Sequence, residues 1–231
     1  MRNKKIILVL VLLGFSVSLT AQNYRNKQLA LISYSYNIHP NIKPQLDEFA
    51  YLLPDLQEPK TDKTIAILKN NSWQILKERL EEETNMYILP ITAHGKDFKY
   101  DEYGYPNMTI NRALRKGNAR YYIRVSIAIA AYSNKTDKGY GTTVNKDTTK
   151  TPEAISEGLL IPEITIEVTT YTRDGILPMQ KVVGSAMATE PWVISPSTFD
   201  GLKKGEDYKL DDPNNIMGLI NSAITNLLRN F

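Results

Sequence analysis

Residues 159–188 constrain the fold more than any other part of the chain. β-branched and polar residues alternate along 159–172, and a second run of mostly apolar residues follows at 176–188. Arg173-Asp174-Gly175 lies between the two runs. An Asp-Gly pair between two strand-like runs is a strong short-range signal for a β-hairpin. We therefore predict an antiparallel hairpin at the centre of a β-sheet.

Two registers of this hairpin can be built from the sequence. A two-residue turn places Val168 opposite Lys181, an apolar side chain against a charge. A three-residue turn with Gly175 left-handed places Glu167 opposite Lys181, and opposite charges on one face favour this second register. Pro178 has no N–H for the ladder, which indicates a bulge or an open edge near the turn. An open edge is a place where another chain can add.

Two segments have the pattern of amphipathic helices. Along 63–84 apolar residues follow one stripe, charged residues mostly follow the other, and Asp62 can cap the start. The C-terminal segment 212–231 also has one apolar face. Asp212 and Pro213 supply a carboxylate cap and a first-turn proline, so we expect this helix to begin there.

Shorter apolar runs complete the order of elements. Strands are expected at 28–36, 86–91 and 120–132, and short helices at 45–53 and 107–116. Strands separated by helices imply parallel neighbours, and the hairpin adds an antiparallel pair. The sequence therefore predicts an α/β (α+β) fold: a mixed sheet of about five strands, packed by two main amphipathic helices. Long loops are expected at 37–62, 92–107, 133–158 and 189–211.

The N-terminus has the features of a secretory signal. Basic residues come first, an uncharged apolar run follows at 6–19, and Ala21 offers a small residue for cleavage. The run is shorter than the roughly 20 residues that a membrane span needs. We therefore predict a signal peptide at 1–21, a single exported domain at 22–231, and no integral membrane span after the signal is removed. The chain has 0 cysteines, so it has neither a lipid-attachment site nor a disulfide.

The net charge of the exported part bears on its partners. Without Arg2, Lys4 and Lys5, the 28 Lys and Arg residues fall to 25, which balances the 25 Asp and Glu residues. Nucleic acid and anionic membrane surfaces both require clustered positive charge. A balanced total charge therefore argues against both as partners.

Four features together resemble a known group of envelope proteins. They are the helix that runs into 87–90, the strand after 118–122, the turn at 173–175 and the closing helix. Over about 29–231 this order resembles the small α/β domain of periplasmic and outer-membrane accessory proteins, such as the amino-terminal domain of the Tol translocation protein, the curli-secretion lipoprotein and lipoprotein activators of penicillin-binding proteins. The resemblance implies a binding or assembly role, and it carries over no catalytic residues. The chain lacks the lipid-attachment cysteine of the lipoproteins.

Residues that could support catalysis or metal binding are few. His39 and His94 are the 2 histidines, and their positions match no metal-ligand spacing. No cofactor, metal site or catalytic residue is therefore predicted. The adjacent Asp101 and Glu102 are the only acids that can be named for an alternative function, hydrolysis of envelope glycans or binding of a small ligand.

Aromatic residues give the best candidates for recognition. Tyr100, Tyr103 and Tyr105 lie in a short polar segment, and Trp192 follows a proline in another. Exposed tyrosines offer a large contact area at low entropic cost, although these rings could instead fold back over the sheet. The leading hypothesis is a periplasmic or outer-membrane-associated binding module that contacts another envelope protein. The contact would use the loop 99–107 or the sheet edge near the hairpin.

Overall fold

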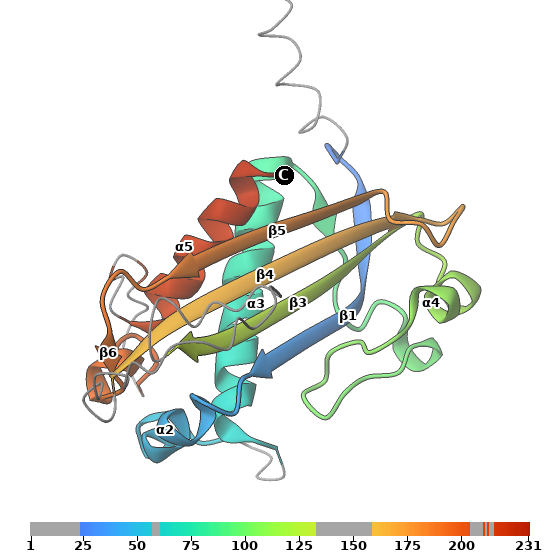
Figure 1. Cartoon of the computed structure of the whole chain (residues 1–231). Helices are drawn as coiled ribbons and strands as arrows, with labels where there is room; N and C mark the ends of the chain where they lie inside the picture. Colours follow the sequence, from blue (N-terminus) through green and yellow to red (C-terminus); the bar gives the residue numbers. More distant parts are fainter. Residues whose placement is uncertain (1–23, 57–60, 133–158, 204–209, 211, 213–214) are drawn as a thin grey trace, which may run out of the picture.

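The computed structural model describes residues 24–56, 61–132, 159–203, 210, 212 and 215–231. A mixed β-sheet with helices packed on it makes up this part of the chain (Figure 1), so the predicted α/β fold is confirmed. The predicted signal peptide at 1–21 and the loop 133–158 lie outside the described residues. The strands are β1 (Gln28–Ile38), β2 (Tyr87–Ile88), β3 (Tyr121–Tyr132), β4 (Leu159–Thr172), β5 (Gln180–Met187) and β6 (Trp192–Val193). The α-helices are α2 (Lys43–Glu48), α3 (Lys63–Thr84), α4 (Ile110–Lys116) and α5 (Ile216–Arg229).

The strand order of the sheet is β2-β1-β3-β4-β5, and β6 pairs with the start of β4. β1 is parallel to β2 and β3, which are reached through helical crossovers. β4 is antiparallel to both β3 and β5. The hairpin strand β4 therefore lies inside the sheet, and β5 forms one edge.

The hairpin register differs from both predicted alternatives. Val168 pairs with Val182, whereas the two-residue turn placed it opposite Lys181, so the observed register differs from that prediction by one residue. Gly175 is not left-handed, unlike in the three-residue turn. The connection 173–179 is longer than either predicted turn. Because Pro178 cannot donate to the ladder, pairing begins only after it.

The charges that favoured the predicted register still meet. Lys181 Nζ lies 2.8 Å from Glu167 Oε2, although the two residues are diagonal neighbours and not direct partners. Diagonal positions on one face of a sheet are within reach of long side chains. The opposite charges of Glu167 and Lys181 therefore predicted that these two side chains meet, but they did not predict which residues of β4 and β5 pair directly.

The two main helices cover one face of the sheet (Figure 1). α3 has the predicted bounds, and Asp62 Oδ1 accepts a hydrogen bond from Ile65 N at 3.0 Å. α5 begins later than predicted: Asn215 is the N-cap, and its side chain accepts from Gly218 N at 2.7 Å. The prediction of Asp212 as the cap is wrong, because the N-cap is Asn215, whose backbone N donates to the carbonyl of Asp212.

The other face of the sheet is covered at one end, by α4 and part of the segment 98–108. β1 is apolar on both faces at its start: Leu29 and Leu31 lie in the cluster on the α3 side, and Ala30 and Ile32 lie in the cluster on the α4 side. A bulge between Leu31 and Ser33 then shifts the alternation by one residue, which places Tyr34 on the α3 side. Tyr34 belongs to the region described below.

Three of the predicted long loops contain ordered elements in the described residues. Segment 37–62 holds α2 and a 3-10 turn at Ala50–Leu52, segment 92–107 holds a turn at Gly95–Asp97, and segment 189–211 holds β6 and a turn at Pro196–Phe199. Within the described residues, none of the helices combines the length and apolar character that a membrane span requires.

Candidate functional site

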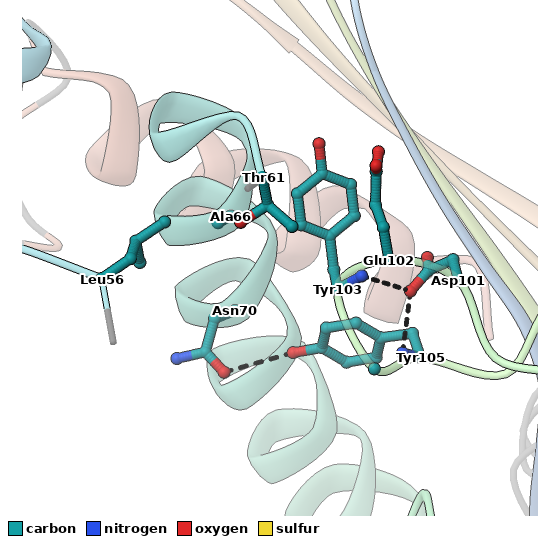
Figure 2. A pocket seen from close by; sticks show the side chains of 9 residues that line it. Leu56, Thr61, Ala66, Asn70, Asp101, Glu102, Tyr103 and Tyr105 are labelled. Carbon is teal, nitrogen blue, oxygen red and sulfur yellow. Dashed lines mark hydrogen bonds between the residues drawn. The ribbon is translucent and has the colours of Figure 1, made fainter. Parts of the chain in front are cut away.

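A recess of about 420 Å³ lies between α3 and the segment 101–105 (Figure 2). One side is formed by the first turns of α3 and the residues before it. The other side carries two aromatic rings and two carboxylates. The lining residues are Leu56, Thr61, Ala66, Asn70, Asp101, Glu102, Tyr103, Gly104 and Tyr105.

A buried lysine holds the two sides of this recess together. Lys69 on α3 is 3% exposed, and its Nζ lies 2.5 Å from Asp101 Oδ2. The same Nζ lies 5.2, 5.0 and 5.1 Å from the ring centroids of Tyr34, Tyr103 and Tyr105. The ammonium group is thus surrounded by one carboxylate and three aromatic rings, which stabilise its charge away from water.

Asp101 also holds the segment 101–105 in a hydrogen-bonded turn. Its Oδ1 accepts hydrogen bonds from Tyr103 N at 3.0 Å and Tyr105 N at 2.9 Å (Figure 2). Its backbone N donates to Tyr105 O at 2.8 Å, and Gly104 supplies the left-handed residue of the turn. Both carboxylate oxygens of Asp101 therefore have structural partners, and the segment is preorganised.

Tyr105 contributes to the core beneath the recess. Its ring packs edge-on against Tyr34, with 4.9 Å between the centroids, and also contacts Trp73. Its hydroxyl donates to Asn70 Oδ1 at 3.2 Å. Tyr105 is buried, so its role is to fix the segment against α3.

Glu102 and Tyr103 present their side chains at the mouth of the recess. Glu102 is exposed, and Tyr103 is half-buried beside it. Burial, with the charge of Glu102 as the next cause, raises the pKa of Tyr103 to about 12. At neutral pH the mouth therefore presents a neutral phenol next to a carboxylate.

The structure separates the four predicted recognition residues. Tyr103 and Tyr105 line the recess, whereas Tyr100 is half-buried and packs against the cluster around α4. Trp192 is buried in the main core and pairs with Leu160. The predicted segment thus brings only part of the set together, and only Tyr103 presents its ring at the recess mouth.

The residue that sequence reasoning missed is Lys69. It occupies a stripe of α3 with Trp73, Leu76 and Leu80, all of which are buried. A lysine among apolar residues at helical spacing is unusual, and this position could have indicated from the sequence that Lys69 is buried. The spacing along α3 does not identify Asp101 as the partner of Lys69.

The described residues contain no group of three or more His, Cys, Asp or Glu side chains that could hold a metal ion. His94 stacks on Phe98, with ring centroids 4.2 Å apart. His39 accepts a hydrogen bond from Asn41 N in a different part of the molecule. The two histidines therefore do not meet.

Alkaline pH is expected to loosen this region. Burial raises the pKa of Tyr34, Tyr103 and Tyr105 above the usual value near 10. Because these pKa values are higher in the folded state than in the unfolded state, the contribution of the three tyrosines to the free energy of unfolding is complete below about pH 10. It is lost as the pH rises toward and above 12. Urea unfolding midpoints at stepwise higher pH should therefore fall together with the appearance of tyrosinate absorbance. Constant midpoints across this window would contradict the burial of these hydroxyls.

A scan against protein-family models gives no match, and a search of curated proteins gives none either. Three solved structures are similar to this chain at low identity. The hypothetical protein CT253 from Chlamydia trachomatis has a TM-score of 0.41 and 8% identity, over 87% of this chain and 92% of that one. The lipoprotein GNA1162 from Neisseria meningitidis has a TM-score of 0.32 and 9% identity, over 71% and 83%. A putative neuraminyllactose-binding hemagglutinin homolog from Helicobacter pylori has a TM-score of 0.35 and 11% identity, over 89% and 81%. Likeness at this level is too slight to indicate a shared function.

Proposed function

We propose that this protein is an exported, non-enzymatic binding module of the cell envelope, and that the segment 99–107 contacts another envelope protein. The observation that carries the proposal is the presentation of Glu102 and Tyr103 at the mouth of the recess, on a segment anchored by Lys69 and Asp101. The signal-like N-terminus supports a periplasmic or outer-membrane-associated location without a lipid anchor.

The chemistry of the mouth favours a basic side chain of the partner. The carboxylate of Glu102 can pair with an ammonium or guanidinium group, and the ring of Tyr103 beside it can contact the same cation. Because Asp101 and Gly104 already fix the turn, little conformational entropy is lost when a partner docks. A preorganised acidic and aromatic mouth is therefore suited to a partner segment with an exposed Lys or Arg.

The sheet edge near the hairpin is a weaker candidate for the contact. The carbonyls of Val183 and Ser185 on the edge strand β5 accept hydrogen bonds from the side chains of Asn230 and Asn226 at 3.2 and 2.8 Å. Helix α5 thus already satisfies acceptors that an added strand would need. The segment 99–107 is the contact that we retain.

The alternative of glycan hydrolysis requires two carboxylates that act on one bond. Asp101 uses both oxygens to bind Lys69 and two backbone N–H groups. Of the two acids among the described residues that line the recess, Glu102 is the one that remains available to a substrate. A recess of about 420 Å³ is nevertheless within the usual range for small ligands, so the test includes saccharides.

Substitutions at the mouth should reduce partner binding. Tyr103→Ala is expected to weaken it by about thirtyfold, the size of an interface hot spot of about 2 kcal/mol, and Glu102→Gln by about tenfold. Crosslinking in intact cells and mass spectrometry identify the captured protein, and pull-down with purified variants then measures its affinity. Tyr87→Ala and Glu82→Gln are matched controls, because both side chains are exposed elsewhere.

Melting temperatures separate a binding defect from unfolding, and Glu102→Gln should not change the melting temperature because its side chain is exposed. Unchanged partner recovery with both mouth variants would reject this segment as the contact. A thermal-shift screen with envelope saccharides tests the alternative. A saccharide at 100 times its Kd would stabilise the protein by about 2.7 kcal/mol, and loss of that shift in Tyr103→Ala would establish a small-ligand site instead.

A further inference from the structure

The connection between β4 and β5 ends in an exposed apolar tip. Ile176 is 55% exposed, Leu177 is 80% exposed and Met179 is 39% exposed. These residues lie close together in the segment 173–179, which Figure 1 shows at one end of the sheet, projecting past the ends of the strands. A cluster of large apolar side chains on a protruding turn normally marks a surface that is covered by something else.

Basic residues lie at the strand ends from which this connection projects, because Tyr121, which two of them contact, pairs with Thr172 at the end of β4. Arg173 is the first residue of the connection, and its N donates to Arg120 O at 2.9 Å. Arg120 and Lys27 both contact the ring of Tyr121, with the Arg120 Cζ 5.7 Å and the Lys27 Nζ 4.8 Å from its centroid. A recess of about 540 Å³ here is lined by Asn26, Lys27, Gln28, Leu89, Asn118, Ala119, Arg120 and Tyr121. Amide groups and two cations therefore surround a space that suits an anionic group.

Further positive charge lies at the same end of the molecule. Helix α4 exposes Arg112, Arg115 and Lys116, and Figure 1 shows it at the end of the sheet where the connection projects. Within the described residues, no ion pair involves Arg173, Arg120 or Lys27. The tip itself carries one acid, Asp174.

We propose that this end of the protein binds an anionic lipid surface, with Ile176, Leu177 and Met179 in the interfacial region and the basic side chains on the lipid headgroups. Apolar residues that insert beside cations are the general requirements for a protein that lies on a membrane without crossing it. The balanced total charge of the exported chain hides this local cluster. Total charge alone therefore does not exclude a membrane surface as a partner of this end of the molecule.

The shape favours a lipid surface over a protein groove. The apolar side chains lie on a protruding turn, which a fluid interface can receive without a complementary pocket. The cations lie to one side of the tip, where inserted apolar residues would bring them to the level of the headgroups. The site is also independent of the recess mouth at Glu102 and Tyr103, so either proposal can fail without the other.

Vesicle flotation tests the proposal with protein purified after expression of the full chain. Vesicles of phosphatidylglycerol and phosphatidylcholine should capture the protein, and vesicles of phosphatidylcholine alone should capture much less. Ile176→Ser with Leu177→Ser should reduce the capture at least about tenfold, because the apolar insertion is lost. Lys27→Gln with Arg120→Gln should reduce it by about fivefold for each charge, which corresponds to about 1 kcal/mol for each basic residue near an anionic surface.

Matched controls test whether the loss of vesicle binding depends on the position of the replaced side chains. Val193→Ser removes another exposed apolar side chain, and Lys63→Gln with Lys77→Gln changes the net charge equally on α3. Both controls should bind vesicles as the unaltered protein does. Melting temperatures of the tip variant should also be unchanged, because the replaced side chains are exposed.

The proposal is overturned if the unaltered protein does not float with anionic vesicles, or if the controls lose as much binding as the tip variant. It is also overturned if the protein self-associates without vesicles and the tip substitutions abolish that association. The tip would then be a contact between copies of this chain.

Discussion

Gly184→Ala should destabilise the protein by about 3 kcal/mol, which lowers the melting temperature by about 6 to 12 °C for a chain of this size. A Cβ at Gly184 would lie 2.3 Å from Leu227 N and 2.5 Å from Ala223 O, both backbone atoms of α5. Backbone atoms of a packed helix cannot rotate away as a flexible side chain can. The helix would therefore have to move off β5 and open the main core.

Gly175→Ala is the matched control for this prediction. Gly175 lies in the exposed connection of the same hairpin, its nearest contact would be 4.0 Å away, and it does not need a left-handed backbone. Thermal unfolding followed by circular dichroism should show no loss of stability for this variant. Equal melting temperatures for the two alanine variants would mean that α5 does not dock closely on Gly184.

The order of elements was accessible from the sequence because local patterns determine it. Asp-Gly between two β-rich runs located the hairpin, and the apolar stripe after Asp62 located α3 with its cap. Each of these signals comes from residues close together in the chain. The start of α5 was misplaced because Asp212 and Asn215 are both good caps, and the sequence does not show which carries the first turn.

The contacts around the recess between α3 and the segment 101–105 could not be predicted from local sequence patterns. Lys69 and Asp101 are 32 residues apart, on a helix and in a turn, and nothing local links them. Trp192 follows a proline in a segment that reads as a loop, yet pairing with β4 buries it. Such contacts follow from the packing of whole elements, so composition identified the aromatic segment without revealing which ring would remain at the surface.

The pair of Lys69 and Asp101 gives the other large expected effect. Lys69→Met should destabilise the protein by about 3 kcal/mol, because the carboxylate of Asp101 would stay largely buried without its cation. The side chains of the two residues are 4% and 17% exposed, so water can replace little of what is lost. Lys63→Met, at the ion pair with the exposed Asp55, should cost at most about 1 kcal/mol.

A double-mutant cycle measured by urea unfolding isolates the pair. Asp101→Asn alone should also be destabilising, because Lys69 would remain among three aromatic rings without a counter-charge. The double variant Lys69→Met with Asp101→Asn should be more stable than the sum of the single effects predicts, since neither partner is then left as a buried charge. Additive effects would show that the two charges do not depend on each other. The segment 101–105 would then need another anchor, and the pair would not be what holds Glu102 and Tyr103 in a fixed position for a partner.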